Sequence, residues 1–188
     1  YVDGEERKAY YFVLTLSASS YIYAEPFRDM TMSSWIEAHC RAFEYFGGTP
    51  KILIPDNTKT AVIKPFSKTE KEPVLNQTYK DLASFYGAAI IPARPLKPQD
   101  KALAEKGVQI VENRIISKLR NRTFLSFEDL HTVSMEELEI VNTSNFKSRP
   151  TNRRALFLEI EKNELLPLPK SRFEYADWKT CKVAFDYH

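Results

Sequence analysis

The feature that most restricts the fold of this chain is a pair of strand-like stretches near its start, separated by only a few residues. Residues 8–17 and 21–27 are nearly continuous in aromatic and branched side chains. Such a continuous pattern is typical of strands that are covered on both faces. Because the connection over residues 17–20 is so short, the two stretches predict an antiparallel hairpin.

Strand-like and helix-like segments then alternate along the chain. Apolar residues at helical spacing predict helices over 30–46, 77–86, 100–122, 126–141 and 155–165, and short buried strands are expected over 51–55 and 88–93. The stretch 58–74 is polar and lysine-rich, so we expect a mobile loop there. The longest helix is expected to bury one apolar stripe, which comprises Ala104, Val108, Val111, Ile115 and Leu119. This order of elements predicts an α/β fold with helices on the faces of a sheet.

The composition excludes several classes of protein. The 188 residues suit one domain with an appendage, and a hydrophobic fraction of 43% is enough for a core. Only 5 glycines are present, which argues against a glycine-rich phosphate loop. The apolar runs are far too short to cross a bilayer. Cys40 and Cys181 lack the spaced partners of a zinc site, so two reduced thiols of a cytosolic protein are the simplest reading, although a disulfide stays possible.

Basic residues are concentrated in two stretches, although the formal net charge is only +2. One stretch lies in the longest predicted helix, and the other lies in the connection that follows the next helix. The first contains Arg114, Lys118, Arg120 and Arg122, and the second contains Lys147, Arg149, Arg153 and Arg154. Such clusters can neutralise phosphates, but solvated helix ends carry them too. Charge alone therefore does not decide between nucleic-acid binding and an ordinary surface.

Two carboxylates stand in settings that suit a site. Asp56 directly follows a short apolar strand, and ligands of α/β sheets gather at the carboxyl ends of strands. Glu105 lies near the start of the longest predicted helix. Each residue also has a structural interpretation, because Pro-Asp-Asn is good turn chemistry and the helix dipole favours Glu in a first turn. Only the pair, in this order of elements, favours a site.

Phosphoryl transfer explains why a chain would need such carboxylates. Two Mg²⁺ ions about 4 Å apart can stabilise the attacking and leaving oxygens of an in-line displacement at phosphorus. Magnesium prefers oxygen ligands, and it takes few protein ligands beside water and phosphate. Neither of two histidines is a good candidate for a ligand or a base. His39 is expected to be packed on a helix stripe, and His131 has no obvious partner.

Four stretches of sequence resemble one known family. They are YIYAEPF (21–27), WIEAHCRAFEYFGGTPKILIPDNTKT (35–60), LNQTYKDLASFYG (75–87) and IPARPLKPQDKALAEKGVQIVENRI (91–115). Together with the tail FEYADWKTCKVAFDYH (173–188), they make the chain similar to the IstA-type transposases of the RNase H-like integrase and transposase superfamily. The resemblance implies that Asp56 and Glu105 are the second and third residues of an Asp-Asp-Glu triad that binds Mg²⁺ or Mn²⁺. Ala104 and Lys106 depart from the family, which usually has a branched residue and Asn there.

The first Asp of the triad has no good candidate in this chain. In the family it lies on the first, central strand of the sheet, which precedes the hairpin with which this chain begins. Asp3 is the one acidic residue in a roughly suitable place, but its surroundings read as a turn. We therefore expect the first strand and its Asp upstream of Tyr1. Without that strand the chain alone should neither fold well nor cut DNA.

The resemblance also implies an organisation and a function. We expect an RNase H-like mixed sheet flanked by helices over 1–122, a helical extension over 123–169, and the start of a C-terminal β-barrel over 170–188. The expected activity is metal-dependent cleavage of transposon ends followed by strand transfer. The expected partners are transposon-end and target DNA, an IstB-type ATPase and further transposase copies, in the bacterial cytoplasm at the nucleoid and not at a membrane. DNA contacts are expected from Lys97, Lys101, Lys106, Arg114, Lys118, Arg120 and Arg122.

Two alternatives stay open at this point. The chain could belong to another RNase H-like nuclease or integrase, which would differ in performing hydrolysis without strand transfer. It could also be a non-catalytic DNA-binding or assembly module that keeps the fold and has lost the triad. An acidic residue on a preceding strand would exclude the second alternative.

Overall fold

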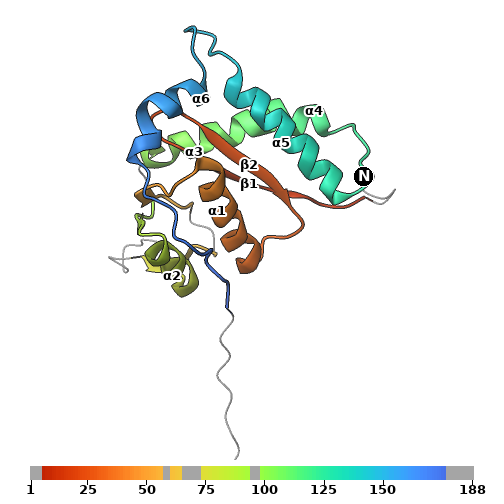
Figure 1. Cartoon of the computed structure of the whole chain (residues 1–188). Helices are drawn as coiled ribbons and strands as arrows, with labels where there is room; N and C mark the ends of the chain where they lie inside the picture. Colours follow the sequence, from red (N-terminus) through yellow and green to blue (C-terminus); the bar gives the residue numbers. More distant parts are fainter. Residues whose placement is uncertain (1–5, 57–59, 65–72, 94–97, 177–188) are drawn as a thin grey trace, which may run out of the picture.

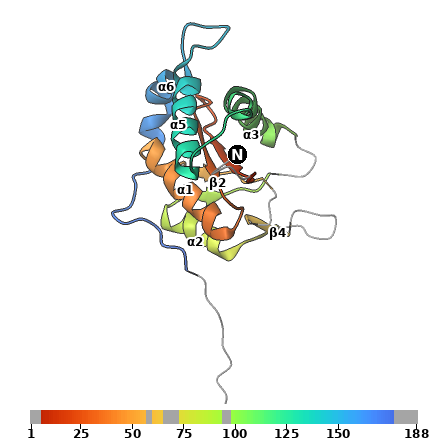
Figure 2. The same cartoon turned by 90° about the vertical axis from the view of Figure 1, so that its right-hand side faces the viewer.

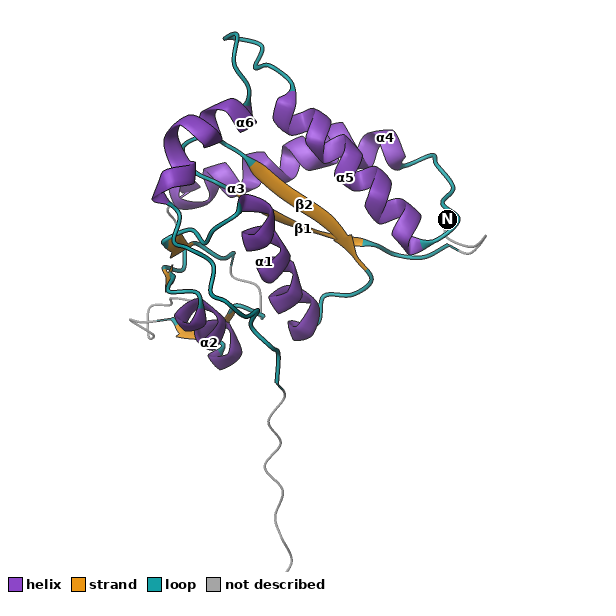
Figure 3. Cartoon of the chain, in the orientation of Figure 1, coloured by secondary structure: helices purple, strands orange, loops and turns teal. Residues whose placement is uncertain are grey.

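The computed structural model describes residues 6–56, 60–64, 73–93 and 98–176, with the side chains of 64 and 98–101 left out. Asp3, Lys97 and most of the expected β-barrel tail lie outside these residues. The arrangement of the described elements is shown in Figure 1 and, coloured by secondary structure, in Figure 3.

The predicted hairpin is present. Strands β1 (Tyr10–Thr15) and β2 (Ile22–Phe27) pair antiparallel in a regular register that runs from Tyr10 opposite Phe27 to Thr15 opposite Ile22. The β2 residues are almost all buried, as the continuous apolar pattern requires. The carboxylate of Glu161, far along the chain, accepts hydrogen bonds from the backbone N–H groups of Ala18 (2.8 Å) and Ser19 (3.0 Å). These bonds satisfy donors of the turn that would otherwise lack partners.

Helices cover both faces of this hairpin. In Figure 2, α1 (Met32–Phe46) and α5 (Phe127–Thr143) lie on one side of it and α3 (Pro98–Val111) lies on the other. The ends of α1 follow from its sequence: the side chain of Thr31 accepts from the N–H of Ser34, and Gly47 ends the helix with φ of 70°. The sequence-based predictions of these three helices are therefore confirmed, with differences of a few residues at their ends.

A second group of short strands lies beside α2 (Gln77–Phe85). Strands β3 (Ile52–Leu53) and β6 (Ala89–Ile90) pair parallel, and β4 (Val62–Lys64) pairs antiparallel with β5 (Val74–Leu75). The prediction of a plain loop over 58–74 was therefore wrong for its described residues in β4 and β5, which pair. Residues 58–59 and 65–72 lie outside the described residues. Ala61 and Val62 are buried there in an apolar cluster with α1 and α2, and burial of these residues outweighs the polar character of the stretch.

The long helix after β6 is α3, which continues through a π-helical segment (Glu112–Ile116) into α4 (Ser117–Leu119). Val111, Ile115 and Leu119 are buried as predicted, but Ala104 is exposed and Val108 is 41% exposed. The buried position of the first half is Gly107 instead. A Cβ at Gly107 would lie 2.1 Å from Oγ1 of Thr15, so the helix can approach β1 this closely only without a side chain there.

The chain after α5 is helical but irregular. It comprises α6 (Arg153–Leu156), a π-helical segment (Phe157–Glu161) and a 3₁₀ turn (Lys162–Glu164). The prediction of a helix over 155–165 was correct in kind, although only its first turn is an α-helix. None of the helices in the described part of the chain combines the length and the apolar character needed to span a lipid bilayer.

Two clusters of buried apolar side chains stabilise the molecule, and α1 contributes to both. The first cluster joins the hairpin to α3, α5 and the segment after α6, and α1 adds Ala42 and Phe46 to it. The second cluster joins β3, β4 and α2, and α1 adds Ile36, Cys40 and Phe43 to it. We call these the hairpin cluster and the short-strand cluster.

Candidate active site

Asp56 lies at the carboxyl end of β3, as the sequence predicts, and it is exposed to solvent. The backbone N–H groups of Ala89 and Ile91 donate to the carbonyls of Lys51 and Leu53, each at 2.9 Å. Because β3 and β6 are parallel, the chain leaves both strands at the same end of this small sheet. That end is where α/β folds place their ligands.

Glu105 lies on α3, the helix that the chain enters after leaving β6. Glu105 is exposed to solvent, and it makes no ion pair within the described part of the chain. Gly107, two positions further on, faces β1, so Glu105 lies away from the buried side of the helix. Asp56 and Glu105 therefore come from segments that leave the same end of the β3–β6 sheet, and both carboxylates have access to solvent.

The donor chemistry of this pair fits part of a magnesium site. Carboxylate oxygens are the ligands that Mg²⁺ prefers, and one or two carboxylates can suffice when substrate phosphates complete the coordination. Among the described residues, however, no group of three His, Cys, Asp or Glu side chains could hold a metal ion. The described residues alone therefore do not test the expected triad, whose first Asp is expected upstream of Tyr1.

The predicted DNA-contacting residues have different surroundings. Lys106 lines a small cavity between α3 and the hairpin, whereas Lys118 forms an ion pair with Glu137 of α5 and so joins two helices. The guanidinium of Arg122 lies 5.6 Å from the ring centre of Phe124. Arg114 and Arg120 are exposed. Lys97 lies outside the described residues, and the side chain of Lys101 is not described.

His39 has the packed position that its helix stripe predicts. Its Nδ1 lies 2.8 Å from the carbonyl of Trp35, and its Nε2 lies 3.2 Å from the hydroxyl of Tyr79. A neutral ring that donates from Nδ1 and accepts at Nε2 satisfies both contacts. Burial lowers the pKa of His39 to about 4, which keeps the ring neutral. His39 is therefore a structural residue of the core.

The expectation that His131 lacks a partner was wrong. Its Nε2 lies 2.9 Å from Oε2 of Glu25, which is completely buried on β2 and which also contacts Nη1 of Arg41 at 3.3 Å. Sequence reasoning missed Glu25, although a carboxylate inside an apolar strand is a signal that a buried partner exists. The three side chains link β2 to α5 and α1.

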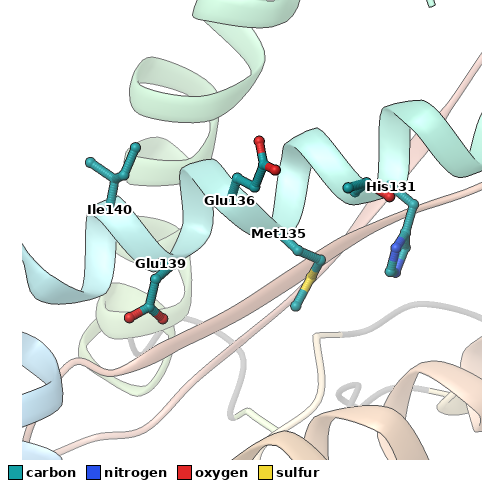
Figure 4. Close-up of a pocket in the computed structure, with 6 residues that line it drawn as sticks. His131, Met135, Glu136, Glu139 and Ile140 are labelled. Atoms are coloured by element: carbon teal, nitrogen blue, oxygen red, sulfur yellow. The ribbon is translucent and has the colours of Figure 1, made fainter.

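A hollow on the surface of α5 does not form a reaction site. Its volume is about 670 Å³, and all the residues that line it belong to α5. Figure 4 shows that Met135 and Glu139 project from one side of this helix, whereas Glu136 and Ile140 project from the other. A surface built on one helix does not enclose a ligand, and active sites are normally concave.

Comparisons with known proteins show what the chain is similar to. No protein-family model matches the chain. It is 42% identical over 185 residues to a protein of Burkholderia multivorans assigned as the transposase for insertion sequence IS408, and 30% identical over 193 residues to the transposase for insertion sequence element IS21 of Pseudomonas aeruginosa. Each alignment covers 98% of this chain, but only 35% and 46% of those relatives. The chain thus spans between a third and a half of their length.

Solved structures show the fold. The catalytic core domain of BIV integrase matches with a TM-score of 0.62 at 15% sequence identity, over 84% of this chain and 90% of that one. A chain of the simian T-cell lymphotropic virus intasome matches with a TM-score of 0.60 at 16% identity, over 93% of this chain and 58% of that one. The chain therefore has the RNase H-like fold of integrase catalytic cores, which confirms this part of the expected fold class. The expected β-barrel tail lies mostly outside the described residues.

Proposed function

We propose that this chain is most of the catalytic core of a DNA transposase of the IstA type, which cleaves transposon ends and joins them to target DNA. The observation that carries the proposal is the position of Asp56 and Glu105. Both exposed carboxylates lie on segments that leave the carboxyl end of the β3–β6 sheet in an RNase H-like fold. The similarity to transposases over 98% of the chain supports the same reading.

In this proposal Asp56 and Glu105 hold Mg²⁺, or Mn²⁺, together with a third carboxylate from an upstream strand. Metal ions held there would supply positive charge to the attacking oxygen of water or a 3′-hydroxyl and to the leaving oxygen of the phosphodiester. The carboxylates fix these charges in place, so their contribution is positioning as well as binding. Basic side chains along α3 and its continuation, such as Lys106 and Arg114, neutralise neighbouring phosphates and hold the DNA in register.

The remaining expectations belong to this proposal. They include binding of transposon-end and target DNA, help from an IstB-type ATPase, assembly of several transposase copies, and a location at the bacterial nucleoid. They also include the division into a core (1–122), a helical extension (123–169) and the start of a β-barrel (170–188). The packing of α5 against β2 means that the extension shares the hairpin cluster with the core.

The test is end cleavage and strand transfer by the full-length protein with Mg²⁺, comparing the parent with Asp56→Asn and Glu105→Gln. We expect both variants to bind end DNA with nearly parental affinity and to lose chemistry by roughly a thousandfold or more, because a metal ligand acts on the transition state. Matched controls are Asp81→Asn, exposed on α2, and Glu112→Gln, exposed on the continuation of α3. The controls should keep parental rates.

One observation favours a second candidate function. The described residues contain only part of a metal-binding set, as a module that has lost catalysis would. If Asp56→Asn or Glu105→Gln keeps nearly parental activity, our assignment of that carboxylate fails. If the parent binds end DNA but neither cuts nor joins it, the chain is a DNA-binding or assembly module. Cleavage without strand transfer would instead indicate another integrase-like nuclease.

A further inference from the structure

A small cavity lies between α3 and the turn end of the hairpin. One of the residues that line it, Lys106, directly follows Glu105 in the sequence. The volume of the cavity is about 80 Å³. It is lined by residues from β1, the hairpin turn, α3, the loop after α5 and the start of α6. Those that matter here are Thr15, Ser20, Lys106, Gly107, Phe146 and Arg153. None of the described residues that line it is acidic.

Beside the cavity, α3 carries a glycine where it meets β1. Gly107 has no side chain, and the hydroxyl of Thr15 takes the space that a Cβ would fill. That hydroxyl is buried and has no hydrogen-bond partner among the described residues. A buried hydroxyl without a partner costs about 1–3 kcal/mol, so it needs an explanation in a native protein. A ligand that accepts or donates a hydrogen bond at this point would supply one.

Arg153 is the second group in this cavity with unused hydrogen-bonding capacity. Its Nη1 donates to the carbonyl of Val141 at 3.1 Å, and its guanidinium lies 5.0 Å from the ring centre of Phe146. Its Nε is buried and has no partner, and no carboxylate in the described part of the chain pairs with it. Burial and the nearby Arg114 lower the pKa of Arg153. A half-buried cation in such surroundings is costly unless an anion accompanies it.

We propose that this cavity binds one phosphate group, either a backbone phosphodiester of DNA or free inorganic phosphate. The cavity offers a ligand two cationic donors, Lys106 and Arg153. It also offers two neutral hydroxyls, those of Thr15 and Ser20. A volume of about 80 Å³ is the share of two to three water molecules, which suits a single tetrahedral oxyanion and is too small for a base or a sugar. Arginine and lysine are the usual phosphate ligands of proteins.

The choice of a DNA phosphodiester rests on the proposed function, whereas the anion site does not. Lys106 directly follows Glu105, so a DNA phosphate in this cavity would be held by the same helix that carries Glu105, on the side that faces β1. The site would then fix the register of the DNA relative to the two carboxylates. It reads no base, because it contacts only a phosphate.

The first arm of the test measures inorganic phosphate binding to the full-length protein, by ³¹P NMR titration and by the shift in Tm at constant ionic strength. The variants are Arg153→Met, Lys106→Met and Thr15→Val. The matched control is Arg149→Met. The guanidinium of Arg149 also lies over the ring of Phe146, 4.6 Å from the ring centre, but Arg149 does not line the cavity. We expect Kd to rise roughly tenfold in each cation variant and to stay unchanged in the control.

Thr15→Val keeps the test valid if Arg153→Met fails to fold. Valine matches the shape of threonine and suits a strand, and removal of an unpartnered hydroxyl should leave Tm without phosphate unchanged or higher. The variant should nevertheless weaken phosphate binding by severalfold. If parent, control and cavity variants all bind phosphate equally well, or if the parent does not bind it, the proposal is overturned.

The second arm identifies the source of the phosphate from the salt dependence of DNA binding. If the cavity holds a backbone phosphate, Arg153→Met should lower the slope of log K against log salt by about 0.9, whereas Arg149→Met should not. An unchanged slope together with lost phosphate binding assigns the cavity to a free anion. Glu105→Gln should leave both readouts unaltered while stopping chemistry, so failure of the phosphate site and failure of the proposed active site can be told apart.

Discussion

The hairpin region and the short-strand region of this molecule differ in how completely they are paired and covered. In the hairpin region, β1 and β2 pair over their whole length and helices cover both faces. In the short-strand region, β3 and β6 have two residues each, and Ile52, Ile54 and Ile91 are about half exposed. The candidate Asp56 belongs to the second region, and the helix with Glu105 packs against the first.

This difference teaches how the fold divides its tasks. The hairpin region buries most of the large aromatic and aliphatic side chains, so it supplies stability and holds α3 in place. The short-strand region has few backbone hydrogen bonds and leaves apolar side chains uncovered around its carboxyl end. Regions of this kind open at low free-energy cost and often carry sites. The two regions that position the carboxylates thus differ in stability: Asp56 lies in the less stable region, and the helix of Glu105 packs against the more stable one.

The largest effect on stability is expected from the hairpin cluster. Phe46 is 1% exposed and packs against Tyr21, Tyr23 and Phe157. Phe46→Ala should lower the free energy of unfolding by about 4 kcal/mol, because a large cavity replaces the ring. Denaturant unfolding measures the change. A loss below about 1.5 kcal/mol would mean that the cluster can collapse around the site, and the contrast between the regions would then disappear.

The next effect is a pH dependence at the boundary of the two regions, where His39 contacts Phe12 of β1 and Tyr79 of α2. The pKa of His39 is 6.5 in the unfolded chain and about 4 in the folded one. As the pH falls from 6.5 to 4, His39 becomes protonated in the unfolded chain but stays neutral in the folded chain. The free energy of unfolding should therefore fall by up to about 3 kcal/mol.

Unfolding by denaturant at several pH values between 4 and 7 tests this expectation. The matched comparison is His39→Gln, which removes the titrating group and should flatten the slope. Because other groups also titrate in this range, only the difference between parent and variant counts. Equal slopes in the two proteins would show that His39 does not stay neutral in the folded state.

A smaller effect is expected where α3 meets β1. Gly107→Ala should gain up to about 1 kcal/mol of helix propensity but lose more to the clash with Thr15, for a net loss of about 1–2 kcal/mol. Thr15→Ala removes the clashing hydroxyl, so the double variant should recover most of the loss. A double-mutant cycle in urea measures this coupling, and simple additivity would show that helix and strand are not in tight contact.

The smallest effect is expected in the short-strand region. Ile54 is 51% exposed just before Asp56, so Ile54→Ala should change the free energy of unfolding by about 0.5 kcal/mol or less. The same denaturant experiment as for Phe46→Ala gives the direct comparison. If Ile54→Ala cost more than about 2 kcal/mol, the side chain would be covered in solution, and the short-strand region would be better packed than the hydrogen bonds indicate.

Local sequence patterns sufficed to predict the elements that follow one regular period. The hairpin, α1, α2 and α5 are of this kind, since apolar spacing and residues such as Thr31 and Gly47 mark their faces and ends. The position of Asp56 after β3 and of Glu105 on α3 also followed from local pattern. Their roles as metal ligands remain predictions, because no group of three metal-binding side chains is found among the described residues.

The missed features depend on contacts between distant segments. The buried face of α3 passes through Gly107 instead of Ala104 and Val108, because the helix must approach Thr15 and because a π-helical segment follows. The link between Glu25 and His131 joins residues that are far apart along the chain. Pairing of β4 with β5 is decided by burial of Val62 against helices and not by the polar residues around it. No local period reports such contacts.

The position of α1 between the two clusters limits how this protein can vary. Ala42 and Phe46 face one cluster while Ile36, Cys40 and Phe43 face the other, so two sides of this helix are committed to different neighbours and its solvent side is left to Ser33, Arg41 and Glu44. A substitution that suits one side can disturb the other, and both must fold together. Neither region is then a module that recombination could exchange alone. Sequence drift should concentrate instead in the surface of α2 and in the loops.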